Sequence, residues 1–190
     1  VIWARLYLDL APYLAYRRAD GADLLGFYHR QVAAVAQADY LTVKHHSALA
    51  AYFDRQGLYL DREEKTPNLR KLSEMTYQQA QARLAMQLAK ALLDYRYLRA
   101  KLAGQGVQAL IEDYALASQA GVEGEKASAL SLVQGALRLS AHALSKDASQ
   151  LPSQLTGRLL GSSVAEAHEL LAQARRDTAN PWLRPLNASL

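Results

Sequence analysis

Several stretches contain residue types that metal sites and active sites use, but their spacing does not suit those sites. His168 and Glu169 resemble the start of a zinc-protease helix, yet no second histidine follows one turn later to complete a metal site. The glycines within residues 121–126 follow a predicted helix and lack the spacing of a phosphate-binding loop. Ser162 and Ser163 lack the paired glycines of a nucleophile elbow. We therefore predict no metal site and no enzymatic activity for this chain alone.

The remaining histidines are candidates for proton transfer or phosphate binding, because imidazole changes its charge near neutral pH. His45 and His46 begin a predicted helix and His142 lies inside another, so we expect structural roles for them. His29 lies where a predicted strand passes into a helix, and an imidazole at that junction can project beyond the edge of its own unit. The spacing alone still favours a structural role for His29 over a functional one.

The elements that would position these residues are predicted to be helices. The 35 alanines and 34 leucines make up 69 of the 190 residues, whereas valine and isoleucine together supply 10. Alanine and leucine lose little freedom in a helix, and β-branched residues lose more. No uncharged run is long enough to span a membrane. The absence of cysteine fits a reducing compartment, so we expect a cytoplasmic protein that does not bind membranes.

Residues 1–41 predict a helix, a hairpin and a second helix. Apolar spacing predicts the first helix over residues 2–14, and the second is expected over residues 30–41. Asp20 and Gly21 predict a type I′ turn, because both central positions of that turn require a positive φ. This order matches the C-terminal half of a winged helix. Because the chain opens inside a predicted helix, we expect it to be part of a longer protein.

Beyond this unit the pattern predicts an antiparallel stack of helices. Apolar residues recur in steps of three and four over residues 84–102, which predicts one continuous helix ended by Gly104 and Gly106. Ser163 and Glu166 predict a capping box for the last helix. Other predicted helices cover residues 44–56, 107–121 and 130–144. The predicted fold is mostly α: an antiparallel helical bundle or stack, preceded by half a winged helix with one β-hairpin.

Two function classes stay open from the residues alone. A winged helix can bind DNA, which would make the chain a DNA-binding regulator with a helical sensing domain. Arg5 is the one cation on the first predicted helix and Asp9 opposes it, while two aspartates offset Arg17 and Arg18 of the hairpin. Few phosphates could be neutralised, so nucleic-acid binding is not expected. The other class is a helical adaptor that binds peptides in a groove.

A family resemblance arises from a set of stretches spread along the chain. These are residues 24–31 (LLGFYHRQ), 45–53 (HHSALAAYF), 67–74 (PNLRKLSE) with 77–79, 137–142 (LRLSAH), 149–155 (SQLPSQL) and 181–185 (PWLRP). As a set they resemble the STAND signalling ATPases of the NB-ARC and NACHT type, and in particular bacterial members with WD repeats. The layout is also similar, more distantly, to the winged-helix and helical domains of the apoptotic protease-activating factor.

The resemblance implies a nucleotide switch in the parent protein. Members of the class hold ADP in a closed state, and exchange for ATP leads to oligomerisation. A histidine of the winged helix contacts the ADP β-phosphate there, and His29 matches that histidine by position. Arg30 stands where the class has an aspartate, and an arginine can itself pair with phosphate or with an acidic neighbour. ADP or ATP is therefore expected in the parent protein, and no cofactor in this chain by itself.

The resemblance also implies a division of the chain and a function. Residues 1–41 are interpreted as the C-terminal part of a winged-helix domain and residues 42–179 as a helical domain. Residues 180–190, stiffened by two prolines, are interpreted as the linker towards a WD-repeat propeller. The expected partners are the protein's own nucleotide-binding domain and propeller, and further copies of the protein after activation. The predicted function is to couple nucleotide state to propeller position, autoinhibition and oligomerisation.

Overall fold

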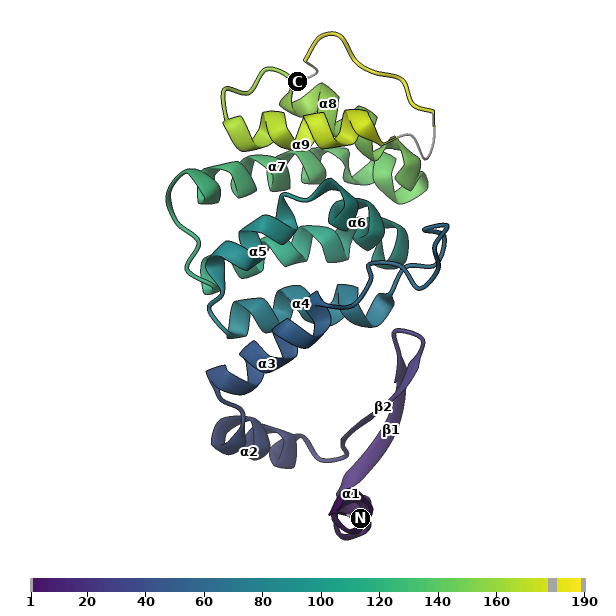
Figure 1. Ribbon diagram of the computed structural model, residues 1–190, viewed down its shortest axis with the longest axis vertical. Coiled ribbons are helices and arrows are strands. Elements are labelled where there is room, and N and C mark those ends of the chain that lie inside the picture. The colour runs from purple at the N-terminus through teal and green to yellow at the C-terminus, as the bar shows by residue number, and fades with distance from the viewer. Residues whose placement is uncertain (1, 178–180, 189–190) are drawn as a thin grey trace.

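The computed structural model describes residues 2–177 and 181–188, and it forms an elongated stack with a hairpin at one end (Figure 1). Over these residues the chain is mostly helical and contains one two-stranded antiparallel hairpin, which confirms the predicted fold class. The elements are α1 (Ile2–Leu10), η1 (Ala11–Tyr13), β1 (Leu14–Ala19), β2 (Ala22–Phe27), α2 (Arg30–Tyr40), α3 (Val43–Asp54), α4 (Leu69–Gln81), α5 (Ala85–Leu92), α6 (Tyr95–Gln119), α7 (Gly124–Lys146), η2 (Ala148–Gln150), α8 (Leu151–Leu159) and α9 (Ala165–Arg176).

The hairpin confirms the turn expected from its sequence. β1 and β2 pair from Leu14 with Phe27 to Ala19 with Ala22. Asp20 and Gly21 have φ angles of 54° and 73°, as a type I′ turn requires. The first predicted helix is shorter than expected, because it ends at Leu10 and continues only as a turn of 3₁₀-helix. That turn contains a proline, which lacks the N–H of a helical hydrogen bond.

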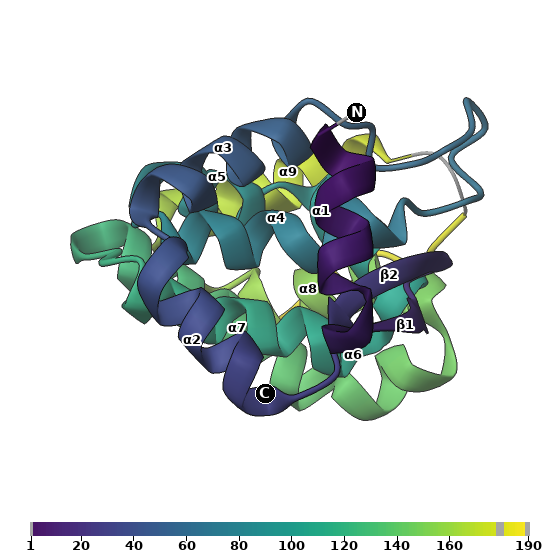
Figure 2. The ribbon, with the colours of Figure 1, turned by 90° about the horizontal axis from the view of Figure 1, so that it is seen from below.

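The core of the molecule lies in the helical stack. α4 packs on α3 and α6, α6 packs on α7, and α7, α8 and α9 complete the series (Figure 1). Leu72, Leu98, Leu110, Leu137 and Leu170 are fully buried along this stack. No residue from 4 to 41 is buried. Figures 1 and 2 both show α1 and α2 apart from each other at the N-terminal end of the stack.

The prediction of one continuous helix over residues 84–102 is wrong, because the structure has two helices there, α5 and α6. Asp94 separates them: its Oδ1 accepts hydrogen bonds from the backbone N–H groups of Arg96, at 2.8 Å, and Tyr97, at 3.2 Å. The carboxylate thus serves as the N-cap of α6. The leucine spacing continues across the break, so the apolar pattern did not reveal it.

Gly104 and Gly106 play different parts in α6. Gly106 has φ 83° and ψ 172° and kinks the element, so the break expected at these glycines is confirmed at Gly106. Gly104 stays helical. A Cβ there would lie 2.9 Å from the side chain of Leu69 and 3.0 Å from that of Pro67. Gly104 therefore permits close packing of α6 against the start of α4.

The C-terminal region differs from the sequence prediction at the start of α9. The capping box predicted for Ser163 and Glu166 is absent: Val164 is the N-cap of α9, and the Val164 N–H donates to Ser162 Oγ at 3.0 Å. Residues 181–185 of the predicted linker have no regular structure. This segment lies back against α8, where Ser153 Oγ donates to the Leu183 carbonyl at 2.8 Å (Figure 1). Residues 180, 189 and 190 of the predicted linker lie outside the described residues.

Candidate functional site

His29 lies at the junction of β2 and α2, as the sequence predicts. It is the N-cap residue of α2, with extended backbone angles, and its carbonyl accepts the Ala33 N–H at 3.2 Å. The imidazole is exposed and makes no capping hydrogen bond of its own. Its ring stands edge-on to the Tyr28 ring, with the centroids 4.8 Å apart. The imidazole is thus presented outward from its own unit.

Arg30 is the first residue of α2 and is exposed like His29. The first N–H groups of a helix lack partners within the helix, and the helix dipole adds positive charge at that end. His29 and Arg30 are adjacent in the chain at this helix end, so each can supply hydrogen-bond donors next to the free N–H groups. Such a group of donors suits an anion such as a phosphate.

His45, His46 and His168 have local structural surroundings, whereas His142 is exposed on α7. His45 completes a capping box with Thr42, whose Oγ1 lies 3.0 Å from the imidazole Nδ1. His46 is buried, and its Nδ1 lies 2.7 Å from Gln78 Oε1. His168 Nε2 lies 2.7 Å from the Ser162 carbonyl. Over the described residues, no group of three or more histidines and carboxylates is placed to hold a metal ion.

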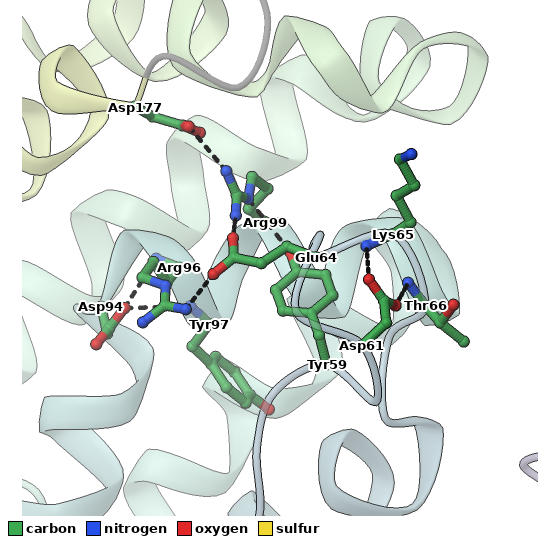
Figure 3. Close-up of polar contacts among 10 residues, drawn as sticks. All are labelled: Tyr59, Asp61, Glu64, Lys65, Thr66, Asp94, Arg96, Tyr97, Arg99 and Asp177. Atoms are coloured by element: carbon green, nitrogen blue, oxygen red, sulfur yellow. Dashed lines mark hydrogen bonds and ion pairs between the residues drawn. The ribbon is translucent and has the colours of Figure 1, made fainter.

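A second polar site joins three segments that are distant in sequence (Figure 3). Arg99 of α6 is at its centre: Nη1 contacts Asp177 Oδ1 at 2.8 Å, Nη2 contacts Glu64 Oε2, and Nε donates to the Tyr59 hydroxyl at 3.2 Å. Arg96 contacts the other oxygen of Glu64. We call Tyr59, Glu64, Arg96, Arg99 and Asp177 the Arg99 cluster. Their sequence separations are too large for any local pattern to indicate the cluster.

The connector between α3 and α4 is ordered before it reaches Arg99. Asp61 accepts the backbone N–H of Lys65 at 3.0 Å and that of Thr66 at 2.5 Å. These hydrogen bonds hold the pKa of the Asp61 carboxyl below its usual range. At the base of the connector, Asn68 Nδ2 donates to the Gly57 carbonyl at 3.1 Å. The connector between α3 and α4 is therefore a structured loop that presents Glu64 to α6.

The Arg99 cluster borders a cavity of about 440 Å³ between the connector and the segment after α9. Tyr95 and Trp182 line it together with Arg99. Burial and the neighbouring Asp177 raise the pKa of the Tyr95 hydroxyl. Each nitrogen group of Arg99 already contacts a partner, so this site is suited to anchoring the segments around it. Those segments are the connector, α6 and the chain that leaves α9.

Comparison with known proteins gives a distant similarity. The chain is similar to NACHT domain- and WD repeat-containing protein 1. It is 30% identical to the human protein in an alignment 146 residues long, and that alignment covers 61% of this chain and 9% of the human protein. It is 27% identical to the mouse protein in an alignment 217 residues long, and that alignment covers 97% of this chain and 14% of the mouse protein. The chain thus spans about a seventh or less of the length of these relatives.

The other two comparisons give no further relative. No protein-family profile matches the chain, and no solved structure matches it significantly. The similarity to NACHT- and WD repeat-containing proteins agrees with the class that the sequence motifs resemble. Within the described residues, the structure contains no helix that is both long enough and apolar enough to cross a membrane.

Proposed function

We propose that the chain is the regulatory arm of a NACHT-type signalling ATPase with WD repeats. In this proposal residues 1–41 complete a winged-helix domain, residues 42–179 form a helical domain, and residues 180–190 lead to a WD-repeat propeller. The arm couples nucleotide state to propeller position and so to autoinhibition and oligomerisation in the cytoplasm. The similarity to proteins that carry both NACHT and WD repeat names supports this assignment.

The observation that carries the proposal is the contrast between the two parts of the chain. The helical stack has a fully buried core, whereas no residue from 4 to 41 is buried. Eleven of the seventeen large apolar side chains exposed in the described part of the chain lie in residues 4–52: eight before residue 42 and three on α3, the first helix of the stack. They are Leu6, Leu8, Tyr13, Tyr16, Tyr28, Val35, Tyr40, Leu41, Val43, Leu49 and Tyr52. Such a surface is typical of part of a domain that packs against further protein.

His29 is the proposed nucleotide sensor. In the intact protein its imidazole would donate to the β-phosphate of ADP, and the exposed Arg30 and the start of α2 would add positive charge. A contact made in only one of two domain arrangements shifts the population towards that arrangement. A charge-assisted hydrogen bond contributes about 1.5–3 kcal/mol, which corresponds to roughly a ten- to a hundredfold shift.

The experiment that tests the sensor uses the intact protein and its bound nucleotide. His29→Ala is expected to release labelled ADP roughly ten- to a hundredfold faster than the unchanged protein and to oligomerise without the signal. His142→Ala is the matched control, because His142 is also exposed but lies on α7, in the helical stack. Equal ADP release from the His29 variant and the unchanged protein would show that His29 is not the sensor. The 190-residue chain alone is expected to hydrolyse no ATP.

A further inference from the structure

The tip of the hairpin reaches the helical stack through one carboxylate. Asp20 occupies the first central position of the β1–β2 turn. Its Oδ2 lies 3.7 Å from Arg70 Nη1 on α4, and its Oδ1 accepts from Gln105 Nε2 on α6 at 3.4 Å. The two oxygens of one side chain therefore contact two different helices, next to the kink at Gly106.

Both donors have a second and closer partner inside the stack. Arg70 Nη1 also lies 3.0 Å from Glu74 Oε1, one turn along α4. Gln105 Nε2 also donates to Ser73 Oγ at a shorter distance than to Asp20. Leaving a buried polar group without any hydrogen-bond partner costs free energy. If Asp20 moved away, Arg70 and Gln105 would each keep the second partner, so this cost would not arise. The contact at the hairpin tip can therefore open without leaving an orphaned group.

Glu74 is itself held ready for Arg70. Its Oε2 accepts from Gln78 Nε2 at 2.8 Å, which leaves Oε1 directed to Arg70. Gln78 is fixed in turn by His46, whose Nδ1 lies 2.7 Å from Gln78 Oε1. The guanidinium of Arg70 also lies 5.9 Å from the centre of the Phe53 ring. The surface that receives the hairpin tip is thus preorganised by α3 and α4, whether or not Asp20 is present.

The contact between the hairpin and the stack lies at the surface. None of the residues from 14 to 27 is buried, so no apolar core joins β1 and β2 to the helices. The side chains of Arg70 and Asp20 retain 33% and 25% of their accessible surface. An ion pair with this exposure is weak and is screened by salt.

We propose that Asp20, Arg70 and Gln105 form a releasable clasp between the hairpin and the helical stack. Closed, the clasp holds the hairpin tip against α4 and α6. Open, it frees the hairpin to move about its connection through α2, while the stack keeps all of its own hydrogen bonds. His29 follows directly after β2, so opening the clasp moves that imidazole relative to the stack. The clasp does not depend on whether His29 contacts a nucleotide.

A distance measurement on the 190-residue chain tests the clasp. The chain has no cysteine, so Ala19→Cys on the hairpin and Ala115→Cys on α6 would carry the only two spin labels. Both positions are exposed. Pulsed electron paramagnetic resonance then gives the distribution of hairpin-to-stack distances. In this background Asp20→Asn removes the charge and keeps a side chain that tolerates the positive φ of the turn.

The expected result is a single main distance in the unchanged chain at about 0.05 M salt and a broader distribution at about 0.5 M. Asp20→Asn should broaden the distribution already at low salt, with roughly two- to fivefold more of the displaced population. Asp23→Asn is the control, because it removes the same charge from the same hairpin but faces Arg18 across the strands. An unchanged distribution in Asp20→Asn, or equal broadening in Asp23→Asn, would overturn the clasp.

Discussion

The ammonium group of Lys101 lies 3.0 Å from Asp113 Oδ2, although the two residues are twelve positions apart within α6. A straight helix would separate them by about 18 Å. The kink at Gly106 folds the two halves of α6 towards each other and makes the contact possible. Lys101 also donates to the Leu72 carbonyl at 2.7 Å, and Tyr97 donates to Asp113 at 2.6 Å. This buried network therefore links both halves of α6 with α4.

Gly106→Ala should destabilise the fold by about 1–3 kcal/mol, because its backbone angles are essentially restricted to glycine. A Cβ at Gly106 would have open space around it, so the loss comes from the backbone and not from a clash. Chemical denaturation measures the free energy of unfolding. Gly135→Ala is the matched control: Gly135 lies inside α7, also with open space, and alanine should stabilise it by about 0.5–1 kcal/mol. Equal effects at both glycines would contradict the importance of the kink.

Removing only Lys101 from the buried Lys101–Asp113 pair should lower the stability of the fold more than removing both residues. Lys101→Met leaves the Asp113 carboxylate buried without its cation, and we expect a loss of about 3–5 kcal/mol. Lys101→Met combined with Asp113→Leu should be less destabilised than the single variant, because no buried charge is left. Thermal denaturation of the two variants and the unchanged chain provides the comparison. A double variant that is less stable than Lys101→Met would refute this reasoning.

The stability of the Lys101→Met variant should also depend on pH. Burial already raises the pKa of the Asp113 carboxyl, and Lys101 counteracts that rise. Without Lys101 the folded-state pKa rises further, so the folded state binds a proton more tightly than the unfolded state. The variant should therefore be most stable below the unfolded-state pKa and lose stability as the pH rises through the folded-state pKa. Urea denaturation over a series of pH values tests this sign, with the double variant as a control that lacks the carboxyl.

Acid should loosen the connector between α3 and α4. The pKa of Asp61 is lowered by hydrogen bonds from the backbone of Lys65 and Thr66. Its contribution to loop order is present above the unfolded-state pKa and is lost as the pH falls through the lowered folded-state value. The amide resonances of Lys65 and Thr66 should titrate with a midpoint below that of an ordinary aspartate. In Asp61→Asn these two amides should show no such titration.

Arg99 should control the order of the segment that follows α9. Arg99→Lys keeps the charge but cannot contact Glu64, Asp177 and Tyr59 together with one planar group. We expect faster amide hydrogen exchange over residues 181–186, measured by mass spectrometry. Arg96→Ala is the control, because Arg96 contacts Glu64 from an exposed position. If both variants exchange like the unchanged chain, Arg99 does not anchor this segment.

The conformational preferences of neighbouring residues are sufficient to predict structure where a single short stretch determines it. The dipeptide of Asp20 and Gly21 specified the hairpin turn, because few other residues accept two positive φ angles in succession. The start of α2 after His29 followed from the end of that hairpin. The apolar periodicity does not predict the helix boundary at Asp94, because the periodicity continues through this residue. Only the capping hydrogen bonds reveal the break.

Local sequence patterns are enough to predict the helical character, the hairpin and the exposed junction that carries His29. These features depend on the preferences of neighbouring residues, which act over one or two turns of chain. The contacts of Arg99 with Glu64 and Asp177, 35 and 78 positions away, arise from the packing of the folded chain. The contact of Asp20 with Arg70 arises in the same way. Such contacts depend on where each helix ends and how the next helix packs against it. Packing throughout the core sets these positions, so no short stretch of sequence predicts them.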